Sequence, residues 1–140
     1  MPLDPGSALC YEPPRPVTLT GAGDAVRWAR SIPDFGAVPE VFAVFLGRAG
    51  RLVRAVWLPA VIGFDELADW PDFVFGYAPA GGVEAVLLLV ARPDEGAEPT
   101  MADAETWDLM RLAHDARGLP LRDIVLVDGP RWHSLAETLG

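Results

Sequence analysis

The stretch "VLLLVARPDEGAEPTMADAE", residues 86–105, decides how this chain is expected to fold. Its aliphatic start predicts a strand over Val83–Ala91 that is buried on both faces, because such a continuous apolar run leaves no side for water. The following "TMAD" is a capping box, in which Thr100 caps a helix and Asp103 bonds back to the amide of the cap. That helix is expected over Ala102–Arg117, since a glycine and then a proline follow it. A strand end and a helix start thus border an acidic loop, a common position for a functional site.

The rest of the chain predicts a layered α/β domain. A helix is expected from Ala22 to Ile32, because its apolar residues recur at helical spacing. Two β-rich runs, Val41–Leu46 and Leu52–Leu58, flank the short turn "GRAGR" and predict a hairpin. Ile124–Val127 predicts another strand, and "RWHSLAE" predicts a last short strand or a strand that leads into a helix. This order of elements indicates helices packed on a mixed sheet.

Length and composition indicate one domain preceded by an arm. The chain has 140 residues, 51% of them hydrophobic and 22% charged, which suffices for a buried core. Residues 1–16 hold five prolines, which prevent helix and disfavour sheet, so an extended Pro-rich arm is expected there. Residues 17–140 are the expected domain. The chain shows no secretory signal and no apolar run of the ~20 residues that a membrane span needs, so a cytoplasmic location is expected.

The net charge of −9 argues against direct contact with nucleic acid, because an acidic chain is repelled by phosphates at long range. All basic residues are arginine, which indicates a GC-rich, bacterial genome. The nearest approach to a basic cluster is Arg48, Arg51 and Arg54, which we interpret as charges that solvate a turn. "TGAGD" at 20–24 precedes a helix but lacks the spacing of a phosphate-binding glycine motif.

Histidine and cysteine offer little for chemistry. His114 follows Asp103 by eleven positions and is expected on nearly the opposite side of that helix. Neither it nor His133 has a partner at zinc-ligand spacing, so both are interpreted as surface or satisfied polar residues. Cys10 is the single cysteine, which excludes a disulfide framework and a thiolate zinc site.

A cluster of aromatic residues lies within residues 59–82, where prolines and glycines interrupt any regular pattern. This cluster leaves two interpretations open. The cluster packs under a loop as part of the core, or it forms an exposed apolar patch that binds a protein partner. Its candidate binding residues are Trp70, Phe73, Phe75 and Tyr77.

Two long stretches resemble the RadC-like branch of the JAB/MPN domain, the JAMM metalloprotease fold. "GAGDAVRWARSIPDFGAVPEVFAVFLGRAGRLV", residues 21–53, is similar to the opening helix and hairpin of that family. "DAETWDLMRLAHDARGLPLRDIVLVDGPRWHSLAE", residues 103–137, resembles its end, where an Asp-led helix reaches "GxPLxDHIIVGDG", an aromatic residue and "SLxE". The resemblance covers roughly residues 17–140 and implies a mixed sheet with flanking helices, in the layered architecture that cytidine deaminases share.

The resemblance also implies a site. In the family, a His-x-His-Pro motif and an aspartate of "Ser-x-x-Asp" hold zinc, and a hairpin glutamate is the general base. Here the base position is Glu40 and the metal-binding aspartate is Asp103. Thr100 takes the place of a serine that stabilises the oxyanion. The two histidine positions, however, are occupied by Val90 and Arg92.

This departure removes the ligands that catalysis needs. Catalytic zinc takes about three protein ligands and keeps one position for water. A lone carboxylate from Asp103 binds zinc poorly, and the permanent cation of Arg92 repels it. Arg92 is instead expected to pair with Asp103 or Glu40.

The leading hypothesis is a non-catalytic RadC-like pseudoenzyme without a cofactor, a binding or assembly module for protein partners or for a second copy of itself. A first alternative is a zinc-dependent JAMM-type peptidase or isopeptidase whose ligands are unusual or supplied in trans. A second is an accessory protein in DNA repair or mobile-element biology that does not itself touch DNA.

Overall fold

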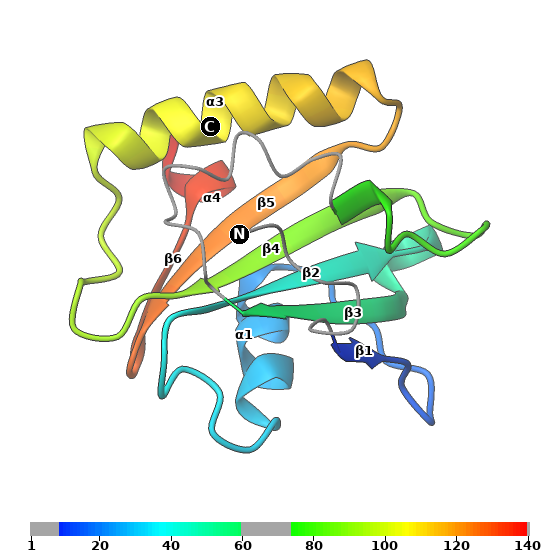
Figure 1. The fold of residues 1–140 in the computed structure, drawn as a ribbon, viewed down its shortest axis with the longest axis horizontal. Helices are drawn as coiled ribbons and strands as arrows, with labels where there is room; N and C mark the ends of the chain where they lie inside the picture. The colour runs from blue at the N-terminus through cyan, green and yellow to red at the C-terminus, as the bar shows by residue number, and fades with distance from the viewer. Residues whose placement is uncertain (1–8, 60–73, 140) are drawn as a thin grey trace.

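A computed structural model describes residues 9–59 and 74–139, and within these ranges the chain forms one mixed sheet with helices on both faces (Figure 1). Six strands are bonded side by side in the order β1-β3-β2-β4-β5-β6. The α/β class expected from the sequence is confirmed. The strands are β1 (Leu9–Tyr11), β2 (Glu40–Leu46), β3 (Leu52–Pro59), β4 (Ala85–Ala91), β5 (Leu121–Asp128) and β6 (Arg131–Ser134). The helices are α1 (Ala22–Arg30), the 3-10 turn η2 (Arg48–Gly50), α3 (Met101–Ala116) and α4 (Leu135–Leu139).

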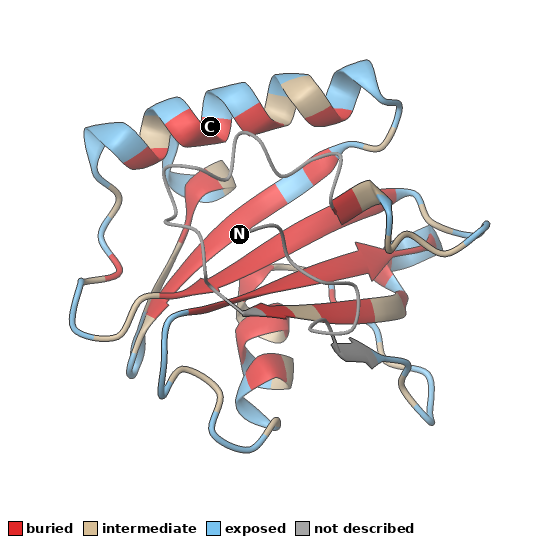
Figure 2. Ribbon diagram, in the orientation of Figure 1, coloured by how far each residue is buried: buried red, intermediate tan, exposed pale blue. Residues whose placement is uncertain are grey.

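Two apolar layers hold the sheet between its helices. Side chains alternate between the faces of a strand. Val41 and Phe45 of β2 join the core cluster that includes α3 and α4, whereas Phe42 and Val44 join the cluster that includes α1. β2 and β4 are buried at every position, and Figure 2 shows them red along their length. This burial explains why both strands are almost entirely apolar in sequence, because a central strand covered on both faces has no side that contacts solvent.

The path of the chain brings two strand ends together. β4 and β5 are parallel neighbours, and α3 connects them. The other strand pairs within the described residues are antiparallel. Parallel strands end at the same edge of a sheet, and in open α/β sheets ligands bind at that edge. Here the loop of residues 92–100 leaves β4, and the chain turns from β5 into β6.

The turn between β2 and β3 is fastened to the segment that precedes α1. Leu19 N donates to Gly50 O, and Leu52 N donates to Val17 O, both at 2.8 Å. Gly50 has a φ of +80°, and a Cβ on it would lie 2.4 Å from Leu19 O. Both the left-handed backbone and the close approach require glycine at this position.

The structure corrects the expectation that the Pro-rich arm stays out of the sheet. Leu9–Tyr11 form β1, an antiparallel edge strand whose residues pair with Ala55–Trp57 of β3. The physical reason is that residues 7–12 contain no proline, so their N–H groups can join a strand ladder. The helix expected to end at Ile32 ends at Arg30. No helix in the described part of the chain is long and apolar enough to cross a membrane.

Candidate functional site

The loop of residues 92–100 is fixed across the carboxyl ends of β4 and β5. Arg92 N donates to Val127 O at 2.8 Å, which extends the strand pairing by one residue. The carboxylate of Asp128, the last residue of β5, accepts from Asp94 N at 3.1 Å and from Gly96 N at 3.0 Å. Three hydrogen bonds to the end of β5 therefore give a loop of this length a defined course.

At the centre of this region, Arg92 and Asp103 form an ion pair. Arg92 Nη1 lies 2.9 Å from Asp103 Oδ1, and the two side chains are only 12% and 2% exposed. Arg92 Nη2 also donates to Gly96 O at 3.1 Å. The predicted pairing of Arg92 with Asp103 is confirmed. At this degree of burial the charges are little screened by water, so removing either one would leave the other without compensation.

The second oxygen of Asp103 is used by the capping box. Asp103 Oδ2 accepts from Thr100 N at 2.8 Å, and Asp103 N donates to Thr100 Oγ1 at 3.2 Å. The predicted capping box is confirmed, and it starts α3 with a negative charge at the positive end of its dipole. Both oxygens of the carboxylate thus have partners from the protein itself.

Glu40 lies on the other face of the sheet. Val41 and Val90 are paired across β2 and β4 and belong to the core cluster beneath α3, so strand alternation turns Glu40 toward α1. The carboxylate of Glu40 is buried and accepts from Gly36 N at 3.1 Å and from Trp57 Nε1 at 3.3 Å. The structure therefore brings Arg92, Thr100 and Asp103 together but leaves Glu40 apart from them.

The residues present do not fit a zinc ion. Val90 is a buried core residue without a donor atom, and Asp103 is already paired with Arg92. Within residues 9–59 and 74–139, no three His, Cys, Asp or Glu residues are placed so that they could hold a metal.

A cavity of about 600 Å³ adjoins the ion pair. Gly96, whose carbonyl accepts from Arg92, is part of its wall. The remaining wall residues come from the loop before α3, the end of β5, the turn that follows it and β6: Glu95, Ala97, Glu98, Asp128, Pro130, Arg131, Trp132 and His133. Sequence reasoning missed this cavity, and the only signal for it was the turn "DGP" followed by large side chains.

The structure places the two histidines in different environments. His114 is fully buried, because α3 packs Trp107, Met110 and His114 against the sheet. Eleven positions correspond to about three helical turns, so His114 lies on the same side of α3 as Asp103, and the expectation of opposite sides is wrong. His133 is half-buried, and its Nδ1 has no hydrogen-bond partner among the described residues.

Burial also governs the ionisation of His114. Its Nδ1 lies 3.1 Å from Leu119 O, whereas Nε2 has no partner in the described part of the chain. Desolvation lowers the pKa of His114, and this outweighs the opposite effect of the Leu119 carbonyl. The imidazole is therefore neutral near pH 7. The ring of Phe75 packs against it with centroids 5.0 Å apart.

Two of the four aromatic candidates can be placed. Trp70 and Phe73 lie outside the described residues. Phe75 is half-buried between His114 and the guanidinium of Arg117, which lies 5.7 Å from its ring. Tyr77 packs against the core cluster beneath α3, and its carbonyl accepts from Arg54 Nη1 at 2.9 Å. Tyr77 therefore packs on the core, whereas Phe75 lies between a buried histidine and an exposed arginine.

No protein-family model matches the chain, and the comparison with curated proteins finds no match either. The resemblance to RadC-like JAB/MPN domains therefore rests on residues 21–53 and 103–137 alone.

Proposed function

We propose that this chain is a non-catalytic RadC-like JAB/MPN domain that acts as a protein-binding module. The observation that carries the proposal is the ion pair between Arg92 and Asp103. The resemblance assigns Asp103 to zinc and Arg92 to a position that a zinc-binding histidine would occupy. A guanidinium at 2.9 Å supplies the positive charge that the metal would otherwise supply to this carboxylate.

Zinc binding would have to overcome this arrangement. Asp103 would give up its bond to Arg92, and the guanidinium would be left partly buried beside a divalent cation. Breaking a buried pair by removing one partner costs about 3–5 kcal/mol, and one carboxylate returns little of that cost. The ion pair therefore argues against zinc-dependent hydrolysis at this site.

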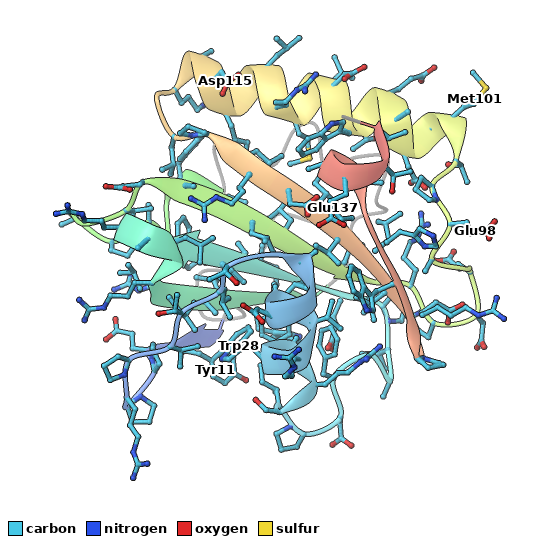
Figure 3. The ribbon with its side chains drawn as sticks, turned by 180° about the vertical axis from the view of Figure 1, so that it is seen from behind. Tyr11, Trp28, Glu98, Met101, Asp115 and Glu137 are labelled. Carbon is cyan, nitrogen blue, oxygen red and sulfur yellow. The ribbon has the colours of Figure 1, made fainter. Side chains whose placement is uncertain are left out.

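The outward face of α3 is the surface that supports a binding role. Leu109 and Leu112 point to solvent with 58% and 65% exposure, although leucine favours the interior. Figure 2 shows the outer side of this helix as its exposed side, and Figure 3 shows Met101 and Asp115 near its two ends. An apolar stripe on an exposed helix is a common docking surface.

Charge indicates what kind of partner fits this face. Glu105, Asp108 and Asp115 are exposed on the same helix, and Arg111 is already paired with Asp108 at 3.1 Å. A second copy would bring the same carboxylates against each other, which is unfavourable. The face therefore suits a protein with a basic, partly apolar surface.

Metal content tests the non-catalytic half of the proposal. Tag-free protein is purified without chelator, offered excess zinc, passed through a desalting column and analysed for bound metal. We expect less than about 0.1 equivalent of zinc, because a single paired carboxylate does not retain it. Asp108→Ala is the matched control for weak surface binding. About one zinc per chain, lost in Asp103→Ala and kept in Asp108→Ala, would contradict the proposal and favour the JAMM-type peptidase.

The docking face is tested with a double substitution, Leu109→Ser with Leu112→Ser. A partner captured by the wild-type chain is purified and titrated against wild type, the double variant and Val38→Ser. Val38 is a matched control because it is also an exposed apolar residue, at 52%, away from α3. Affinity should fall at least about tenfold in the double variant alone. Equal binding by all three proteins would contradict the assigned face, and self-association lost in the double variant would show that its occupant is a second copy.

A further inference from the structure

A second cavity lies at the opposite end of the sheet from the ion pair. It has a volume of about 560 Å³ and opens between the Pro-rich segment of residues 12–16 and the turn that joins β2 to β3. Gly47, Arg48, Arg51, Leu52 and Val53 form the hairpin side of its wall, and Gly82 completes it. A volume of this size accommodates a small organic molecule.

Three arginines converge on this cavity, and the described residues do not neutralise them. Arg15 comes from the Pro-rich segment, and Arg48 and Arg51 come from the hairpin turn. All three are exposed, and each ion pair found within residues 9–59 and 74–139 involves other arginines. The one acidic residue in the wall, Glu12, is paired with Arg54 at 2.9 Å.

This concentration of positive charge stands out against the rest of the chain, which carries a net charge of −9. A fourth arginine is close, because Arg122 Nη1 lies 3.8 Å from the position that a Cβ would take on Gly50. Like charges gathered at one place repel each other, so the arrangement is most favourable when an anion lies among them.

The wall of the cavity is preformed. Hydrogen bonds from Leu19 and Leu52 fasten residues 17–19 to the hairpin turn, and prolines fix the φ angles of the preceding segment. Groups held in place before binding lose little entropy when a ligand arrives. Pro13, Pro14 and Val53 add apolar surface beside the guanidinium groups.

We propose that this cavity binds a small phosphate-bearing molecule, such as a nucleotide. Guanidinium groups bind phosphate oxygens through paired hydrogen bonds, and the apolar wall receives the uncharged part of the ligand. The ligand is a small molecule rather than a nucleic acid, because the cavity gathers only a few arginines and the chain as a whole is acidic. The site is independent of the ion pair at the other end of the sheet and of the face of α3.

The test is isothermal titration of the full chain with ATP, pyrophosphate and adenosine at low ionic strength. ATP and pyrophosphate should bind and adenosine should not, and added salt should weaken binding. Arg48→Gln and Arg51→Gln should each weaken ATP binding about tenfold, because each removes charged hydrogen bonds to phosphate. Arg131→Gln is the matched control, an exposed arginine at the far end of the sheet that belongs to no ion pair within the described residues.

Three results would overturn the proposal. They are no binding of ATP or pyrophosphate at millimolar concentration, equal binding of adenosine, or the same loss in Arg131→Gln as in the two cavity variants. These surface substitutions should leave the melting temperature within about 1–2 °C of wild type, so a loss of binding is not a loss of folding.

Discussion

The two ends of the sheet use arginine in opposite ways. At the carboxyl ends of β4 and β5, Arg92 is nearly buried and is paired with Asp103. At the hairpin turn, Arg48 and Arg51 are exposed around a cavity and have no acidic partner among the described residues. The same side chain therefore contributes to stability at one end, and at the other it is available to a ligand. Burial and the nearest charge make the difference, and both can be altered by substitution.

The largest effect is expected for Asp103→Ala. This change leaves Arg92 uncompensated in a nearly buried position and removes the capping box of α3. The free energy of unfolding should fall by about 3–5 kcal/mol, as measured by urea denaturation. Asp108→Ala breaks an exposed pair on the same helix and should cost less than about 1 kcal/mol. Similar losses in both variants would show that burial does not set the Asp103 pair apart.

Gly50→Ala tests whether the hairpin end is as rigid as the cavity requires. The new methyl group would lie 2.4 Å from Leu19 O at a φ of +80°, so we expect a loss of about 2–4 kcal/mol. Gly36 is the matched control, because its φ is +84° and a Cβ there would meet nothing within 4 Å. Gly36→Ala should cost about 1 kcal/mol from backbone strain alone. If the two variants unfold at the same urea concentration, the turn is not locked against residues 17–19.

Arg92→Ala and Arg48→Ala compare the two ends directly. The first leaves Asp103 nearly buried with only its capping bonds, and the expected loss is about 2 kcal/mol. The second removes an exposed side chain and should change stability by less than about 0.5 kcal/mol. Thermal unfolding of both variants alongside wild type measures the difference. An unchanged melting temperature for Arg92→Ala would contradict a stabilising role for the pair.

The smallest effect is a dependence of stability on pH that His114 produces. Burial lowers the pKa of His114 below its ordinary 6.5, so as the pH falls through 6.5 the unfolded chain binds a proton before the folded chain does. Stability should therefore decrease as the pH falls from about 7, and this contribution should level off below the folded pKa. Burial raises the pKa of Asp123, which has the opposite effect on stability at lower pH. Wild type and His114→Gln both contain Asp123, so its effect is the same in the two proteins. Melting temperatures of wild type and His114→Gln between pH 8 and 5 should converge at low pH, and parallel curves would contradict this assignment.

The sequence predicted those parts of the site that depend on residues close together along the chain. The capping box of Thr100 and Asp103 is an interaction across three positions, so it can be found in the sequence. The pairing of Arg92 with Asp103 was expected because the resemblance placed both residues at one site. The position of Glu40 was missed because a change of one residue along a strand exchanges the two faces of a sheet. The side of α3 on which His114 lies was predicted wrongly, because eleven positions are about three helical turns and return His114 to the side of Asp103.

The sequence alone determined the order of the strands and helices from α1 onward, the ends of α3 to within one residue and the buried character of β4, because each depends on residues close together along the chain. β1 was not predicted, because its partner β3 is distant in the sequence. Only the tertiary structure decided which residues, distant in the sequence, line the same cavity. Arg15 lines one cavity together with Arg48 and Arg51, and Glu95 and His133 both line the cavity beside the ion pair. Such contacts depend on the register of the strands and on the path of the loops, which no short stretch of sequence specifies.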